Sequence, residues 1–272
     1  MKNNDKINLL NDAMFKSLVR SSEARNIVLK VIHDITHVAM EELEQANFIG
    51  GEIPKMNMHA KGKISDVIIS ANTNSLILEM NQWYTSEILD KNLQYAFAWN
   101  VQSSHLTKII LINFDEFNTP FHTDKPLLEF KMRDEDRHVE SDLITSYHLI
   151  LANYNNPLYN VSEETRTFME FLHSKKTITE LEEKYKGNEA YLKMIKKIKK
   201  LTQDEKFMGY YDLEEKHQWQ LNDSYKTGVK QGIEQGVHQN KIEMAKMMLG
   251  KYSQEEIIRL TGLTKKEITN LK

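Results

Sequence analysis

The first half of the chain changes from helical to strand-like hydrophobic spacing. Asp12 can cap a helix whose apolar residues lie on one side as far as Val19. A second helix that starts at Ser21 or Ser22 keeps apolar residues at helical spacing as far as Ile35. The pattern breaks around residue 50, so extended segments are expected after two N-terminal helices.

Residues 64–70 and 75–81 are two runs rich in apolar and β-branched residues, separated by a short polar turn. This pattern predicts a β-hairpin. If Asn72 and Thr73 form the centre of the turn, Asp66 lies directly opposite Glu79. A shift by one residue would place Glu79 on the apolar face, so the hydrophobic pattern supports this register. That apolar face would hold Val67, Ile69, Leu76, Leu78 and Met80.

The later segments complete an α/β pattern. A helix is predicted after Ser86, and the almost continuous apolar run at 106–114 is typical of a strand covered on both faces. A further strand or loop is expected at 147–154, and from about residue 162 onward the pattern is helical. We therefore expect a mixed α/β core at 1–160, a helical extension at 161–220 and a helical tail at 221–272.

The tail has a short internal repeat and two helix-start signals. Gly228, Gly232 and Gly236 recur every four residues, which places them near one helix face. Two matches to the capping box predict a terminal pair of short helices, at Ser253 with Glu256 and at Thr264 with Glu267. Such a pair is either a helix-turn-helix DNA reader or a hairpin for docking or oligomerisation. The second is favoured because the last helix is short, and it suggests a homo-oligomer.

Composition restricts the chemistry. The 272 residues include no cysteine, which excludes disulfides, thiolate zinc sites and cysteine nucleophiles. The chain has no apolar run of about 20 residues that would span a bilayer, and no signal-peptide core, so a cytoplasmic location is expected. Residues 1–150 hold 15 Lys and Arg against 21 Asp and Glu, whereas the remainder holds 21 against 18. Basic side chains are therefore concentrated toward the C-terminal half, where they form either a solvated helical face, which is the more common case, or a stripe that contacts phosphates.

The predicted pair of Asp66 and Glu79 carries the candidate chemistry. Two carboxylates directly opposed on neighbouring strands repel each other, so their pairing points to a bound cation that offsets the charge. Carboxylate, carbonyl and water oxygens suit Mg²⁺, Mn²⁺ or Ca²⁺. The alternative is a pair of exposed carboxylates at a sheet edge, with no ligand.

Several motifs resemble those of one nuclease family. Asp66, a hairpin and then Glu79-Met80-Asn81 resemble the D…(D/E)-x-K core of the PD-(D/E)XK nucleases. The wider match is to the recombination-promoting nuclease and putative transposase branch, and it covers nearly the whole chain. Its motifs are similar to residues 11–16, 91–95, 110–114 and 261–264 of this sequence, where 91–95 stands for an Arg-Asn-x-x-Tyr helix motif.

The resemblance implies a restriction-endonuclease-like fold, with a four-stranded mixed sheet flanked by helices, and a metal-dependent endonuclease acting on DNA. Asp66 and Glu79 would be the ligands of Mg²⁺, and the Met80 carbonyl would be a further ligand. Asn81 stands at the position of the family's lysine and Lys91 at that of its helix arginine. Asn81 is neutral, so the positive charge that the family's lysine supplies would have to come from the side chain of Lys91, or from that of Lys61 or Lys63.

Other residues are candidates for secondary roles. Glu23 and Glu52 can each add a carboxylate to the site, and Tyr95 belongs to the helix motif that starts at Lys91. Gln82, Trp83 and Tyr84 follow the Glu79 strand and either stack on bases or pack the loop. Two functions are consistent with these features. The first is a DNA endonuclease tied to recombination or transposition, and the second is a DNA-binding or oligomeric scaffold that keeps the fold without effective turnover.

Overall fold

The computed structural model describes residues 6–49, 52–53, 63–64, 66–102, 108–136 and 139–271. The chain forms two compact units, Met1–Glu215 and Lys216–Lys272. Among the residues described, no helix combines the length and the apolar character that crossing a membrane requires.

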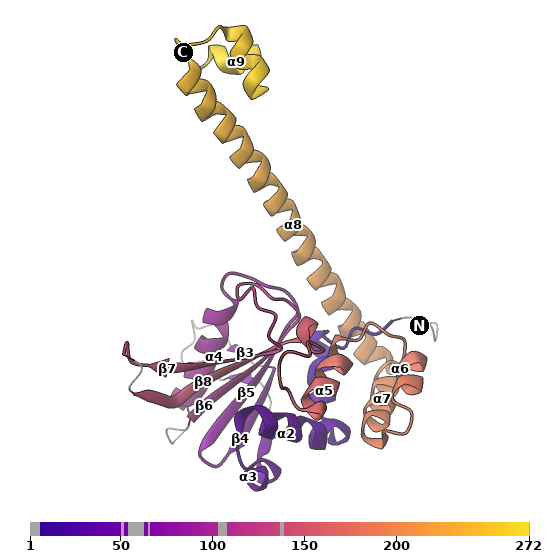
Figure 1. The fold of residues 1–272 in the computed structure, drawn as a ribbon. Helices are drawn as coiled ribbons and strands as arrows, with labels where there is room; N and C mark the ends of the chain where they lie inside the picture. The colour runs from indigo at the N-terminus through magenta and orange to yellow at the C-terminus, as the bar shows by residue number, and fades with distance from the viewer. Residues whose placement is uncertain are drawn as a thin grey trace. The chain divides into compact units, whose positions relative to one another are not determined.

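The first unit is an α/β domain built on a six-stranded mixed sheet (Figure 1). Its strand order is β1-β4-β5-β6-β8-β7, in which β5, β6 and β8 run parallel and the other neighbours are antiparallel. The strands are β1 (Asn47–Ile49), β4 (Val67–Ala71), β5 (Asn74–Asn81), β6 (Lys108–Asp115), β7 (Leu127–Arg133) and β8 (Glu140–Ile150). A separate two-stranded sheet pairs β2 (Glu52–Ile53) with β3 (Lys63–Ile64).

The sheet differs in size from the four strands that the family resemblance implied. Six strands are present, and the added edge strand β7 had no counterpart among the predicted elements. Most side chains of β7 are exposed or only partly buried, so the strand lacks the apolar run that marks an inner strand. The predicted strand or loop at 147–154 comprises the end of β8, which runs from Glu140 to Ile150, and a 3₁₀ turn at Leu151–Asn153.

Helices lie on both faces of the sheet. The main core lies between the sheet and α1 (Asp12–Val19), α2 (Ser22–Thr36), α5 (Glu163–His173), α6 (Ile178–Lys184) and α7 (Glu189–Leu201). Phe114 of β6 ties these layers together, because its ring packs against Phe15 of α1 and Phe168 of α5. On the other face, α4 (Ile88–Gln102) covers a smaller cluster that contains Ile77 and Leu111. The short α3 (Met40–Gln45) and a 3₁₀ turn at Leu151–Asn153 complete the unit.

The predicted hairpin register is confirmed. Val67 pairs with Leu78 and Ala71 with Asn74, and Asn72 adopts the positive φ of 34° that the tight turn requires. Val67 and Leu78 are fully buried in the main core, as the apolar pattern predicted. A one-residue slip would bury Glu79 in this core, which explains why the register is so well specified.

The cap of α1 differs from the prediction by one residue. Asn11, not Asp12, is the N-cap, and its side-chain oxygen accepts a hydrogen bond from the Met14 amide at 3.2 Å. Asp12 is instead the first helical residue, where its carboxylate pairs with Lys16 one turn later at 2.8 Å. Asp12 thereby shares the Lys16 ammonium with Asp66.

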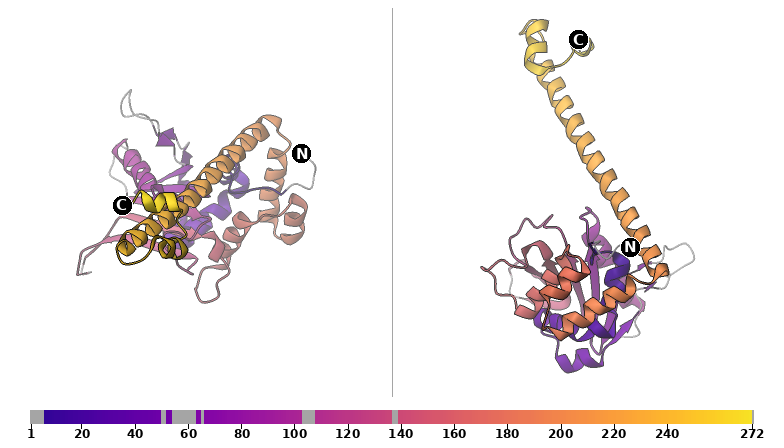
Figure 2. Two further views of the ribbon diagram at one scale, coloured as in Figure 1. Left: turned by 90° about the horizontal axis from the view of Figure 1, so that it is seen from above. Right: turned by 90° about the vertical axis from the view of Figure 1, so that its right-hand side faces the viewer.

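The second unit contains most of α8 (Glu205–Met248), followed by α9 (Gln254–Thr261) and α10 (Lys265–Thr269). Gly228, Gly232 and Gly236 lie within α8, which is one continuous helix (Figure 2). Both predicted capping boxes form, and Gly262 ends α9 with a φ of 67°. Ala245, Ile257, Leu263 and Ile268 form a small core that holds the three helices together.

Candidate functional site

Asp66 and Glu79 follow directly on the last pair of the β4–β5 ladder. Val67 pairs with Leu78, so Asp66 just before β4 and Glu79 within β5 occupy the next position. Their exposed fractions are only 7% and 2%. The alternative of two exposed carboxylates at a sheet edge is therefore wrong, and burial without compensation of two such groups would be costly.

Asp66 is held by backbone and by α1. One carboxylate oxygen, Oδ2, accepts a hydrogen bond from the Met80 amide at 2.6 Å, and the other, Oδ1, lies 3.2 Å from Lys16 Nζ. Arg20, at the end of α1, donates from Nη2 to the Asp66 carbonyl oxygen at 2.6 Å. Because Lys16 and Arg20 are one helical turn apart, both reach the same strand end from one side of α1.

Lys16 bridges two carboxylates. Its ammonium lies 2.8 Å from Asp12 Oδ1 and 3.2 Å from Asp66 Oδ1. Burial alone would lower the pKa of Lys16, but the charges of Asp66 and Asp12 outweigh burial and raise it. Lys16 is therefore protonated, and its ammonium places a positive charge beside the buried Asp66 carboxylate.

Burial raises the pKa of Asp66 to about 6, and the neighbouring Asp12 carboxylate adds to the rise. Lys16 and the Met80 amide act in the opposite direction but do not cancel the effect of burial. Asp66 and Asp12 share the Lys16 ammonium, and burial leaves the ionised form of Asp66 poorly solvated, so a bound cation would stabilise it.

The raised pKa of Asp66 predicts a pH-dependent stability. The folded state binds this proton more tightly than the unfolded state, whose pKa is near 3.8, so the stabilisation is complete below pH 4 and is lost as pH rises through 6. At pH 7.5 the ionised Asp66 should cost up to about 3 kcal/mol. We expect Asp66→Asn to be more stable than wild type at pH 7.5, with the advantage vanishing toward pH 4.

Urea unfolding at pH 4 and 7.5, in the presence of a chelator, tests this expectation. Asp90→Asn is the matched control, since Asp90 is exposed on α4 and should respond equally little at both values. If the difference in free energy of unfolding between Asp66→Asn and wild type is the same at both pH values, burial does not raise the pKa of Asp66.

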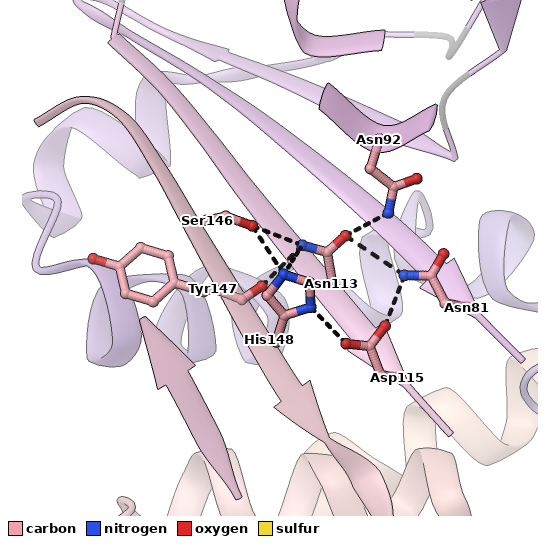
Figure 3. A network of polar contacts seen from close by, with 7 residues as sticks. All are labelled: Asn81, Asn92, Asn113, Asp115, Ser146, Tyr147 and His148. Carbon is pink, nitrogen blue, oxygen red and sulfur yellow. Dashed lines mark hydrogen bonds and ion pairs between the residues drawn. The ribbon is translucent and has the colours of Figure 1, made fainter. Parts of the chain in front are cut away.

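Asn81 takes part in a buried polar network on the α4 face of the sheet (Figure 3). Its amide nitrogen donates to Asp115 Oδ1 at 2.7 Å and lies 3.5 Å from Asn113 Oδ1. Asn92 of α4 also donates to Asn113 Oδ1, at 2.7 Å. Asn81 is 3% exposed, so the residue at the family's lysine position is a neutral link between β5 and β6.

The other predicted site residues are only partly described. Lys91 is exposed in α4, beside the buried Asn92. Glu52 and Lys63 lie in β2 and β3, and Tyr95 in α4, but the side chains of all three, and the whole of Lys61, fall outside the described residues.

Two further predictions concern residues whose contacts are described. Glu23 accepts a hydrogen bond from Ser22 at 3.1 Å, and its pKa is lowered mainly by its own backbone amide, with a small effect from lysines of α7. None of these described contacts joins Glu23 to Asp66. Past β5, Gln82 is partly buried, Trp83 is 41% exposed, and the Tyr84 ring packs edge-on against Phe117. Tyr84 therefore packs the loop, whereas Trp83 remains accessible.

Asp12 and Lys16 were not predicted as members of the site. Both belong to the motif at residues 11–16, which the sequence showed only as a family-like opening. Their spacing of four residues, acid before base, placed them on one helix face, but nothing local indicated that this face would meet Asp66.

The carboxylate pair fits a hard divalent cation. Asp66 and Glu79 provide buried oxygen donors in the same hairpin, and the raised pKa of Asp66 reflects the burial of a carboxylate whose ionised form a cation would stabilise. Within the described ranges, no three Asp, Glu or His side chains are grouped to hold a metal ion by themselves. A cation here would therefore need backbone or solvent oxygens to complete its shell.

Two comparisons, one with models of protein families and one with curated proteins, give no match. The function therefore has to be inferred from the site itself.

Proposed function

We propose that the chain is a divalent-metal-dependent DNA endonuclease with a restriction-endonuclease-like core. The observation that carries the proposal is the burial of Asp66 and Glu79 in one hairpin, whose register sets them at the position next to Val67 and Leu78, with the Lys16 ammonium 3.2 Å from Asp66. Buried acids and a lysine converging at the end of a mixed sheet are the parts that hydrolysis of a phosphodiester requires. The similarity of the sequence motifs to recombination-promoting nucleases supports DNA as substrate and a role in recombination or transposition.

Each residue has a defined task in this proposal. Asp66 and Glu79 hold the cation, with the Met80 carbonyl as a further oxygen donor. The cation, Mg²⁺ or alternatively Mn²⁺ or Ca²⁺, supplies charge stabilisation and activation of water when bound. Lys16 holds Asp66 in place through its ammonium and keeps a positive charge beside the phosphate that undergoes cleavage. Lys16 thereby takes the part that Lys91, Lys61 or Lys63 was expected to take.

A second function is favoured by one observation. Asn81 carries no charge, and its side-chain amide donates a hydrogen bond to Asp115 Oδ1 at 2.7 Å. The side chain therefore points to the neighbouring strand and not to a substrate. This arrangement suits a scaffold that binds DNA without cutting it. Lys16 distinguishes the two functions, because a nuclease needs its charge during the reaction and a scaffold does not.

Nicking of supercoiled plasmid by the wild-type protein tests the proposal. We expect nicking with Mg²⁺ or Mn²⁺ that stops when a chelator removes the metal. Plasmid that is bound with a salt-dependent affinity but stays intact with all three metals would favour the scaffold.

The tail carries a separate prediction, of self-association. Leu221, Tyr225, Val229, Ile233 and Val237 recur every four residues in α8 and are all at least 43% exposed. Such a row on a polar helix is typical of a surface that pairs with a second copy. Removing residues 221–272 is expected to lower the mass in solution to that of a monomer, measured by light scattering. An unchanged oligomeric state would show that the tail takes no part in self-association.

A further inference from the structure

A cavity of about 260 Å³ lies on the α4 face of the sheet, within the first unit. Its walls are mainly apolar and come from α4, from β6, β7 and β8, and from the segment before β7. They include Leu89, Leu111, Phe121, Phe130 and Ile144. A mainly apolar cavity with a few convergent polar groups is typical of a small-molecule site.

The polar part of this cavity contains a serine and a histidine from one strand. Ser146 and His148 are two residues apart in β8, so their side chains share a face of the sheet. Ser146 Oγ lies 3.1 Å from His148 Nε2, and His148 Nδ1 lies 2.7 Å from Asp115 Oδ2 (Figure 3). The chain thus holds a serine, a histidine and an aspartate in one hydrogen-bonded row, with the distances of a nucleophile, its base and the acid that orients it.

The neighbouring asparagine fixes the direction of the hydrogen bonds at Ser146. Asn113 lies 3.0 Å from the Tyr147 carbonyl, which can only accept, so the atom facing it must be the amide nitrogen. The same nitrogen is 3.1 Å from Ser146 Oγ. That nitrogen lies farther, 3.4 Å, from His148 Nε2. Ser146 is therefore its nearer acceptor and has its own proton to give to His148 Nε2.

The aspartate fixes the tautomer of the histidine. Asp115 accepts from Asn81 through Oδ1 and faces His148 Nδ1 through Oδ2. Because a carboxylate only accepts, Nδ1 carries the proton and Nε2 is the basic nitrogen that faces Ser146. Asp115 is 1% exposed and His148 3%, whereas Ser146 is partly exposed at the cavity. The acid and the base are thus buried, and the nucleophile is accessible.

One buried atom points to a ligand. Asn92 lines the cavity and is 2% exposed, and its Oδ1 has no hydrogen-bond partner in the part of the chain that the structure describes. A buried acceptor without a partner is rare in a folded protein, and a bound molecule with an N–H or O–H donor would satisfy it.

We propose that Ser146, His148 and Asp115 form a second catalytic site, which hydrolyses carboxylic esters whose apolar acyl group fits the cavity. Ser146 Oγ bonds to the ester carbonyl carbon while its proton passes to His148 Nε2. The ester bond then breaks, and the leaving alcohol takes that proton. Water, activated by the same histidine, cleaves the acyl-serine, releases the carboxylic acid and restores Ser146.

Covalent labelling of the full-length wild-type protein tests this site. An alkyl fluorophosphonate probe is expected to add one phosphonyl group, located at Ser146 by peptide mass mapping. Ser146→Ala should lose this label, whereas Ser141→Ala, also in β8, should label at the wild-type rate. His148→Gln should label about 10²- to 10⁴-fold more slowly, because the general base is gone.

Hydrolysis of 4-nitrophenyl butyrate provides the second measurement. The activity should be lost in Ser146→Ala and kept in Ser141→Ala. Folded wild-type protein that takes up no probe would overturn the proposal, and so would labelling or hydrolysis that persists in Ser146→Ala. In either case the three residues only tie β6 to β8.

Discussion

Replacing Glu79 by Gln is expected to reduce metal-dependent plasmid nicking by roughly 10³-fold while leaving the protein folded. Gln has the shape of Glu but carries no charge, so it fills the same buried position, which is 2% exposed, and cannot hold a divalent cation tightly. Asp66→Asn is expected to have the same effect. Its side-chain oxygen can still accept from the Met80 amide, which now lies 2.6 Å from the carboxylate.

The matched control for both variants is Glu87→Gln. Glu87 is an exposed carboxylate between β5 and α4, so its loss tests whether general surface charge matters. Nicking at the wild-type rate is expected in this control. Equal nicking by wild type, Glu79→Gln and Asp66→Asn would show that the active site does not lie on this hairpin, even if the nicking depends on a metal.

Replacing Lys16 by Met is expected to have the second-largest effect, a loss of about 10²-fold in nicking. Met keeps most of the length of the side chain but removes the ammonium that lies 3.2 Å from Asp66. Because Lys16 lowers the pKa of Asp66, its removal should raise that pKa above about 6. Activity that depends on ionised Asp66 falls as pH drops through this pKa. The activity–pH curve of Lys16→Met should therefore lie at higher pH than that of wild type.

Lys30→Met is the control, because Lys30 is exposed on α2. Its rate and its pH curve should match those of wild type. A Lys16→Met protein with a wild-type rate and an unshifted curve would show that Lys16 has no part in the reaction. A scaffold that binds DNA without cutting it would then be the better proposal, because neither Asn81 nor Lys16 would supply a charge for the reaction.

The local parts of the fold could be predicted from the sequence. The hairpin register followed from the apolar face of β4 and β5, because a shift by one residue inverts every side chain. The two capping boxes of the tail were predicted for a similar reason, since each is a reciprocal contact within four residues. In both cases the residues that determine the structure are neighbours in the chain.

The contacts that complete the candidate site could not be predicted, because they join distant segments. Lys16 meets Asp66 across 50 positions of the chain, and only the packing of α1 against the sheet brings the two together. The resemblance placed Asn81 at the position of the family's lysine, but the sequence did not show that its amide donates to Asp115 of the neighbouring strand. Parallel pairing of β5 with β6 sets Asn81 beside Asp115, and the hydrophobic pattern of either strand alone does not specify that partner.

The sequence also carries a signal of the buried polar network. Asn113 and Asp115 alternate within the apolar β6, and Ser146 and His148 do so in β8. Polar residues at every second position of a buried strand must find partners on the same face. This spacing indicates a buried polar network, and a pair of such strands marks the face of the sheet where chemistry is to be sought.

Titration of Mn²⁺ into the metal-free protein, followed by calorimetry at pH 7.5, tests the central claim most directly. The claim is that Asp66 and Glu79 together hold a divalent cation. We predict saturable binding by wild type and by Glu87→Gln, and loss of that binding in both Asp66→Asn and Glu79→Gln. Binding that persists unchanged in these two variants, or its absence from folded wild type, would contradict the account.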